Sequence, residues 1–185
     1  MVFRRFTLRE FVETDRAAFI TYQTDPRYRQ LYDFDDNPER PSQLLNLFLQ
    51  WQREQPRLNI QLAICETATG KLLGSAGLRK VDNDAAVLGI ELAPAEWGRF
   101  RLALDTCIVL LGYGFETLNL AAVVGSTASG NWRVEKLARR FGARVVARRS
   151  GPDWMQARRW QEVDWEITRD GWGLMTSAAA LLHGN

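Results

Sequence analysis

Residues 87–142 decide the fold of this chain. VLGIELAP (87–94) is an apolar strand, and AEWGRFRLALD (95–105) leads through a loop into a long apolar helix. AAVVGSTAS (121–129) is a second strand, and NWRVEKLARRFG (131–142) is a helix that ends at a glycine. A strand, a loop and a helix in this order are typical of sites that hold pyrophosphate against a helix N-terminus. The stretch therefore predicts an α/β core with an anion-facing loop.

The N-terminal part of the chain joins a strand to two helices. RFTLREF (5–11) alternates as a strand does, and residues 13–26 are typical of a helix with acidic residues in its first turn and a proline stop. Residues 28–40 are polar and aromatic without a period, so they predict an irregular link. A second helix is predicted to begin at Pro41-Ser42, where apolar residues return at helical spacing.

The middle of the chain is predicted to form an antiparallel meander. The runs NIQLAICE (59–66) and KLLGSAGLRKV (71–81) are separated by the turn TATG, which is typical of a β-hairpin. A second turn at 82–84 leads into the strand that contains VLGIEL. Strand-like runs return at 143–150 and 161–170. The pattern predicts an α/β fold of the α+β kind, a mixed sheet with helices on its faces.

Length and composition indicate one globular domain over residues 1–185. A chain of 185 residues can bury a core of its own. Its 24 basic residues are nearly matched by 22 acidic ones, for a net charge of +2. This balance argues against a polyanion such as nucleic acid as a partner. The tail GLMTSAAALLHGN (173–185) fits a short helix, a frayed end or a dimer contact, and a homodimer stays open.

The two cysteines and the apolar runs bear on the cellular location. Cys65 and Cys107 each lie in an apolar run, which fits buried reduced thiols better than a disulfide. The N-terminus has no apolar core of a signal peptide, and the longest apolar run, CIVLLGYGF, is too short to span a bilayer. We therefore expect a cytoplasmic protein without membrane association.

Four segments carry a resemblance to a known family. They are TLREFVETD (7–15), ATGKLLGSAGL (68–78), LGIELAPAEWGR (88–99) and DWEITRDGW (164–172). In this order and spacing they resemble the GCN5-related N-acetyltransferase (GNAT) superfamily, in its branch of ribosomal-protein alanine N-acetyltransferases. The resemblance covers nearly the whole chain.

The resemblance implies both a fold and an activity. The fold is a mixed, mostly antiparallel sheet of six or seven strands with a central splay and helices on both faces. The activity is transfer of an acetyl group from acetyl-CoA, as co-substrate and without a metal, to a primary amine of a protein N-terminus or small molecule. Two alternatives stay open: a degenerate GNAT-fold protein that serves as a binding or dimerising module, and a transferase for another acyl-CoA.

The loop after the strand departs from the family pattern, Trp-Gly-basic-Gly-aromatic-Ala-Thr-Glu. Here the second glycine is replaced by Phe100 or, on another count, by Arg101. A side chain at that point opposes close approach of the backbone to phosphate. Either Arg99 and Arg101 rebuild the site with charge-assisted bonds, or both are solvated and Phe100 covers apolar surface. The cofactor-binding residues that the resemblance implies are Leu92, Ala93, Trp97, Gly98, Arg99, Phe100, Arg101, Leu102, Ala103 and Asn131.

Glu91 is the candidate general base. Acetyl transfer from a thioester needs a neutral amine and therefore a group that removes its proton. Glu91 interrupts an apolar strand, where a carboxylate should have a perturbed pKa. The alternative is that the strand is half-exposed and Glu91 faces water. Asp105 is assigned a structural role near the start of the following helix.

Other residues are weighed between binding and structural roles. Asn131 matches the family position that contacts the pantetheine arm, and it can also be a helix N-cap. Val134 stands where the branch often has serine, so the usual hydroxyl donor to the thiolate is absent. His183 is the one histidine, which argues against a zinc site, and Cys107 is assigned to the core. The basic residues of 133–149 have three possible roles: contact with the cofactor's phosphates, contact with an acidic partner, or a solvated surface. Five tryptophans either line a substrate groove or are packing residues: Trp51, Trp97, Trp132, Trp154 and Trp160.

Overall fold

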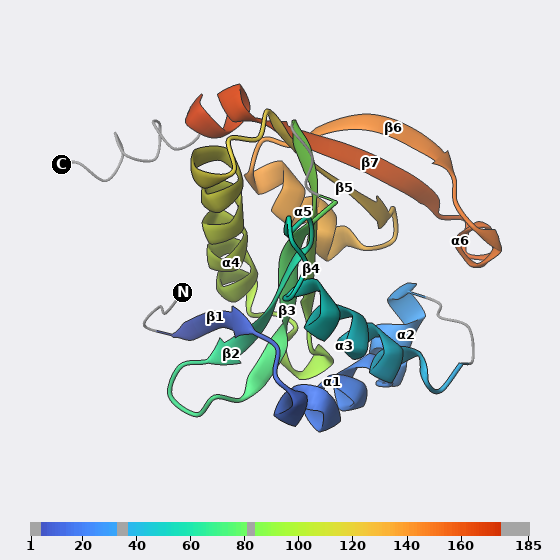
Figure 1. Ribbon diagram of the computed structural model, residues 1–185. Coiled ribbons are helices and arrows are strands. Elements are labelled where there is room, and N and C mark those ends of the chain that lie inside the picture. The colour runs from blue at the N-terminus through green and yellow to red at the C-terminus, as the bar shows by residue number, and fades with distance from the viewer. Residues whose placement is uncertain (1–4, 33–36, 81–83, 175–185) are drawn as a thin grey trace. The chain divides into compact units, whose positions relative to one another are not determined.

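The computed structural model describes residues 5–32, 37–80 and 84–174 (Figure 1). The seven strands follow the hydrogen-bonded order β1-β2-β3-β4-β5-β7-β6. The ladders β1–β2, β2–β3, β5–β7 and β6–β7 are antiparallel, whereas β4–β5 is parallel. The predicted mixed, mostly antiparallel sheet of the GNAT fold is therefore confirmed, with seven strands. The chain divides into two compact units, each described by itself below, and the single domain over 1–185 stays a prediction.

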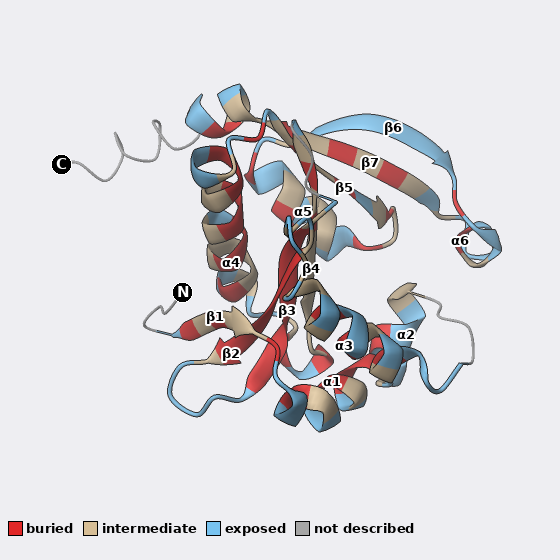
Figure 2. Ribbon diagram, viewed as in Figure 1, coloured by how far each residue is buried: buried red, intermediate tan, exposed pale blue. Residues whose placement is uncertain are grey.

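The first unit packs helices and strands around an aromatic core. Phe11, Phe19 and Phe48 are buried and meet one another at ring-centroid distances of 5.4–5.8 Å. Strands β2 and β3 are buried along nearly their whole length, as the red ribbon in Figure 2 shows. Its elements are β1 (Phe6–Glu10), η1 (Glu13–Asp15), α1 (Arg16–Gln23), α2 (Pro26–Tyr32), α3 (Arg40–Trp51), β2 (Ile60–Glu66), β3 (Leu72–Arg79), residues 88–92 of β4 (Ala85–Leu92), η2 (Pro94–Glu96) and the start of α4 (Phe100–Gly112).

The second unit is built on the ladder of β5, β7 and β6. β7 alternates, with Val163, Trp165 and Ile167 buried, while β6 is exposed along its whole length (Figure 2). Its elements are residues 85–87 of β4, the end of α4, η3 (Tyr113–Thr117), β5 (Ala122–Ala128), α5 (Trp132–Arg140), β6 (Arg144–Ser150), α6 (Asp153–Ala157) and β7 (Gln161–Thr168).

The prediction of an irregular link over residues 28–40 was wrong for residues 28–32, which belong to a helix. Pro26 begins the helix α2 instead of only ending the preceding one. The Asp25 side chain accepts a hydrogen bond from the Arg27 N–H at 2.8 Å, and the Asp25 carbonyl accepts one from the Arg29 N–H at 3.0 Å. A proline is tolerated in the first turn because its missing N–H has no intrahelical partner there.

Two other local predictions have different outcomes. The stretch between the predicted strand-like runs 143–150 and 161–170, for which no helix was predicted, contains the short helix α6. Of the turn predicted at 82–84 and the tail 173–185, only Asp84, Gly173 and Leu174 are among the described residues. His183 lies outside them.

The parallel ladder between β4 and β5 is short. It joins Ala85 to Ala122, Ala86 to Val123 and Val87 to Val124, and no further pair follows. Both strands continue beyond it, to Leu92 and Ala128. Among the described residues, the parallel pairing is thus limited to residues 85–87 of β4.

Candidate active site

Glu91, near the end of β4, contacts two polar side chains of the helices α1 and α2. The Tyr28 hydroxyl donates a hydrogen bond to Glu91 Oε2 at 2.6 Å, and Gln23 Nε2 donates one to the same oxygen at 3.0 Å. Gln23 Nε2 also lies 3.0 Å from the Tyr28 hydroxyl oxygen. Among the described residues, none forms a hydrogen bond with Glu91 Oε1. One carboxylate oxygen is thus held in place, and the other keeps its capacity to accept a proton.

A glycine and an arginine prepare the strand surface beside Glu91. Gly89 shares a strand face with Glu91, because successive side chains point to opposite faces. The Arg79 guanidinium lies over Gly89, where a Cβ atom would collide with it. The positive charge of Arg79 therefore comes near Glu91, and an alanine at position 89 would displace it.

Burial raises the pKa of the Glu91 carboxyl group. Its hydrogen bond with Tyr28, the charge of Arg79 and the hydrogen bond with Gln23 act in the opposite direction. Burial and the nearby Glu91 charge also raise the pKa of Tyr28 and Tyr22 well above 10.0. Both tyrosines are therefore protonated at neutral pH, and Tyr28 acts as a hydrogen-bond donor to the carboxylate.

The sequence alone did not identify the partners of Glu91. A signal was present, because three of the four tyrosines lie within residues 22–32. The rings of Tyr22 and Tyr28 pack edge to face with centroids 5.6 Å apart, and Tyr28 lies 4.6 Å from Tyr32. With the segment predicted as an irregular link, nothing in the pattern indicated that these rings meet β4.

The loop after β4 is shaped by Trp97 and Gly98. The Trp97 indole N–H donates a hydrogen bond to the Leu92 carbonyl at 2.9 Å, which folds the loop back onto the strand. Gly98 has a φ of +97°, a backbone conformation that L side chains rarely adopt. A Cβ at Gly98 would meet nothing within 4 Å, so its surface is open. Helix α4 then begins at Phe100.

The two arginines of the loop are exposed and form ion pairs. Arg99 lies 2.6 Å from Glu96, and Arg101 lies 2.9 Å from Asp105. Glu96 is buried and also pairs with Lys71 at 2.9 Å. Burial alone would raise the pKa of Glu96, but the hydrogen bonds from Arg99 and Lys71 lower it below its ordinary value.

The remaining residues assigned to the co-substrate divide between loop and strand. Leu102 is buried, whereas Phe100 and Ala103 are half-buried. The Ala93 N–H donates to the Leu73 carbonyl of β3 at 2.8 Å. Since backbone groups alternate along a strand, Ile90 and Leu92 direct theirs away from β3. The carbonyl of Leu92 is already taken by the Trp97 indole N–H.

Asn131 occupies the N-cap position of α5 but makes no capping hydrogen bond with its side chain. The residue is buried, at 5% exposure. Its carbonyl accepts hydrogen bonds from Val134 and Glu135 at 3.1 and 3.3 Å. The structural role therefore belongs to the backbone, and the side-chain amide is not used for capping.

Other candidates have structural positions. Cys107 is buried, and burial raises the pKa of its thiol to about 12, so its assignment to the core is confirmed. Trp154 and Trp160 contact each other edge to face, while Trp132 is 58% exposed. The basic residues Arg139, Arg144 and Arg149 are exposed and paired with acidic side chains.

Two absences hold for the described part of the chain. Residues 5–32, 37–80 and 84–174 contain no group of three His, Cys, Asp or Glu side chains placed to hold a metal ion. Within the same ranges no helix combines the length and apolar character that a membrane crossing requires.

Comparison with known proteins identifies the family. Residues 5–144 match the acetyltransferase (GNAT) domain, so the chain belongs to the GNAT acetyltransferases. No curated protein sequence matches it significantly. The ribosomal-protein alanine branch stays a prediction.

Solved structures share the fold at low sequence identity. Spermidine N-acetyltransferase from Vibrio cholerae, in complex with CoA and spermine, aligns with a TM-score of 0.74 at 15% identity, over 91% of this chain and 98% of the other. An acetyltransferase from Agrobacterium tumefaciens aligns with a TM-score of 0.70 at 22% identity, over 90% and 92%. A GNAT-family acetyltransferase from Bacillus anthracis gives 0.72 at 16% identity, over 90% and 96%.

Proposed function

We propose that this protein is an acetyl-CoA-dependent N-acetyltransferase that acts on a primary amine. The observation that carries the proposal is the half-buried Glu91 carboxylate, held by Tyr28 and Gln23 through Oε2 and without a hydrogen bond on Oε1 among the described residues. A base for an amine needs this combination of fixed orientation and one accepting oxygen.

In the proposed reaction Glu91 removes a proton from the bound ammonium group. Because the pKa of Glu91 is raised toward neutral pH, its carboxylate is a stronger proton acceptor than an ordinary carboxylate. Acetyl-CoA supplies the acetyl thioester; the new N–C bond replaces the C–S bond, and the thiolate leaves. The proton lost by the attacking nitrogen protonates the thiolate through water, because the branch's usual serine position is Val134.

Several residues are proposed to bind the co-substrate. The strand backbone at Leu92 and Ala93 and the side chain of Asn131 would contact the pantetheine arm. The loop from Trp97 to Ala103 would contact the phosphates, with Gly98 open and the N-terminus of α4 favouring negative charge. Arg99 and Arg101 would exchange their carboxylate partners for phosphate oxygens.

A binding or dimerising module is the second candidate function. It is favoured by the ion pairs of Arg99 and Arg101, which are satisfied without any ligand. A transferase for another acyl-CoA differs from the first proposal only in the acyl group.

Thermal melting with and without acetyl-CoA tests the proposed function. A ligand at 100 times its dissociation constant stabilises the native state by about 2.7 kcal/mol, which raises Tm by several degrees. We expect such a rise with acetyl-CoA and with CoA. If neither ligand raises Tm and calorimetry detects no binding, the module is the better description.

Tyr28→Phe tests how Glu91 is tuned. The Tyr28 hydroxyl stabilises the charged carboxylate, so its removal should raise the pKa of Glu91 further. The acidic limb of the kcat/KM profile should move to higher pH, while the rate on the alkaline side changes less. Tyr113→Phe is the control, since Tyr113 is the one tyrosine outside residues 22–32. An unshifted limb in Tyr28→Phe would contradict the assignment of Glu91 as the titrating base.

A further inference from the structure

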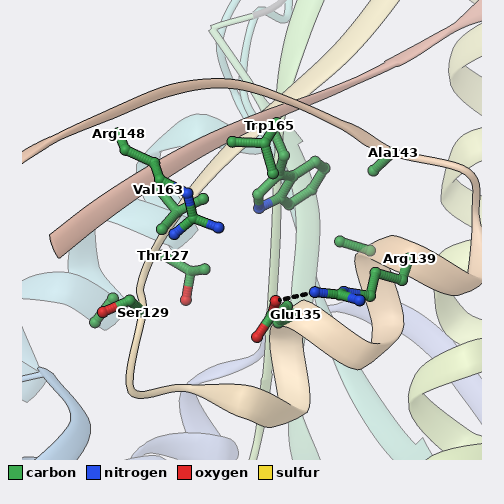
Figure 3. Close-up of a pocket in the computed structure, with 11 residues that line it drawn as sticks. Thr127, Ser129, Glu135, Arg139, Ala143, Arg148, Val163 and Trp165 are labelled. Atoms are coloured by element: carbon green, nitrogen blue, oxygen red, sulfur yellow. Dashed lines mark hydrogen bonds and ion pairs between the residues drawn. The ribbon is translucent and has the colours of Figure 1, made fainter. Parts of the chain in front are cut away.

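A cavity lies in the second unit, between helix α5 and the surface of β5, β7 and β6 (Figure 3). Its volume is about 300 Å³, at the lower end of the range for small-molecule pockets. None of the residues that line it belongs to the Glu91 cluster or to the loop 92–103.

The register of the strands places the lining residues on one face. Val163 pairs with Thr127 on one side and with Arg148 on the other, and Trp165 pairs with Val145. Residues directly opposite in a ladder share a face, and so do residues two apart on one strand. This face therefore combines apolar side chains with one hydroxyl and one guanidinium.

Trp165 supplies a buried donor without an acceptor. Its side chain is 7% exposed, and its indole N–H has no hydrogen-bond partner among the described residues. The indole packs against Gly125 so closely that any Cβ there would overlap it. An indole N–H can only donate, and buried donors without partners are rare. The ring is thus fixed in place, and its buried N–H lacks an acceptor among the described residues.

Arg148 supplies a positive charge that its own face does not neutralise. Within residues 5–32, 37–80 and 84–174 it forms no ion pair, whereas Arg144 and Arg149 pair with acidic residues of β7. The one carboxylate that lines the cavity, Glu135, is bound to Arg139 at 2.7 Å, as the dashed line in Figure 3 marks. The cavity therefore keeps one excess positive charge.

The hydroxyl groups add to the donor excess. Ser129 Oγ accepts a hydrogen bond from the Gln161 N–H at 3.0 Å, so its own proton stays available. The Thr127 hydroxyl can also donate. Donors thus outnumber uncommitted acceptors, and Val145, Val163 and the face of the Trp165 indole provide an apolar wall.

We propose that this cavity binds a small organic carboxylate with a compact apolar body. The carboxylate accepts hydrogen bonds from Arg148, Thr127 and the Trp165 indole N–H, which converts the excess of donors into complementary contacts. The apolar body packs against Val145 and Val163. A neutral amide of the same shape has no negative charge to pair with Arg148, so we expect it to bind more weakly.

Benzoate is a suitable probe, with benzamide as its neutral counterpart. The chain is labelled with 15N at its tryptophan indoles, and the Trp165 signal is assigned from Trp165→Phe. We expect benzoate to shift this signal in a saturable way and benzamide to leave it unchanged. An unmoved signal at tens of millimolar benzoate would overturn the proposal, as would an equal response to benzamide.

Two arginine variants test the charge. Arg148→Gln should weaken benzoate binding about tenfold or more, because a hydrogen bond to a charged group is lost. Arg144→Gln on the same strand is the matched control, since Arg144 does not line the cavity, and it should bind as the wild type does. Ala138→Leu should fill the cavity and abolish the shift. Equal weakening by both arginine variants would show unspecific attraction and refute the site.

Discussion

Glu91→Gln should lower kcat/KM for amine acetylation by about 10²–10⁴-fold, the usual contribution of a positioned general base. The amide keeps the shape of the side chain and can still accept hydrogen bonds from Tyr28 and Gln23, but it cannot take up a proton. The loss should appear mainly in kcat, with KM for acetyl-CoA nearly unchanged. The measurement is a steady-state assay with acetyl-CoA and an accepted amine.

The same variant should remain folded, and its stability should report the pKa of Glu91. The folded-state pKa is raised, so the carboxyl contributes stability fully below its unfolded pKa and loses it as pH rises through the folded pKa. The glutamine of Glu91→Gln does not titrate, so this variant does not lose stability in that way. Its free energy of unfolding relative to wild type should therefore increase as pH rises from the unfolded to the folded pKa of Glu91. Glu116→Gln, at an exposed site, is the control for activity. Full activity of Glu91→Gln would remove Glu91 as the base.

Phe19→Ala should lower the free energy of unfolding by about 3–5 kcal/mol, as expected for truncation of a fully buried aromatic side chain. Phe19 is 0% exposed and meets Phe11, Tyr22 and Phe48 at ring-centroid distances of 5.6, 5.1 and 5.8 Å. The substitution would leave a cavity beneath α1, the helix that carries Gln23. Urea unfolding followed by fluorescence measures the effect.

A control variant on the surface of the same unit separates the effect of burial from that of losing an apolar side chain. Leu47→Ala on α3 removes an apolar side chain that is 37% exposed, so it should change stability by less than about 1 kcal/mol. If both variants lose the same amount, the aromatic cluster is not the centre of this unit's stability.

Most strands and the main helices follow from local pattern. Alternating residues predicted β1, and a strand-like run predicted β7. The TATG turn predicted the β2–β3 hairpin. Helical spacing predicted α3, and the asparagine-led run that ends at a glycine predicted α5. Gly70 has a φ of +72°, which agrees with the predicted turn chemistry. These elements depend on nearest neighbours along the chain, where sequence is most informative.

The helix α2 could not be predicted in the same way. Its seven residues, PRYRQLY, have no clear period, and a short helix gains little stability by itself. It is held instead by Tyr28, buried at 1% exposure beside Tyr22 and bonded to Glu91. Contacts between residues 63 positions apart are invisible to a local pattern.

The sequence by itself determined the order of the strands and the main helices, the GNAT resemblance and Glu91 as a carboxylate in an apolar strand. Only the tertiary structure decided what surrounds that carboxylate, how Arg99 and Arg101 are paired, and that Trp165 and Arg148 line one cavity. The physical reason is that a carboxylate's pKa and an arginine's partner depend on burial and on atoms a few ångströms away, and folding alone brings those atoms together.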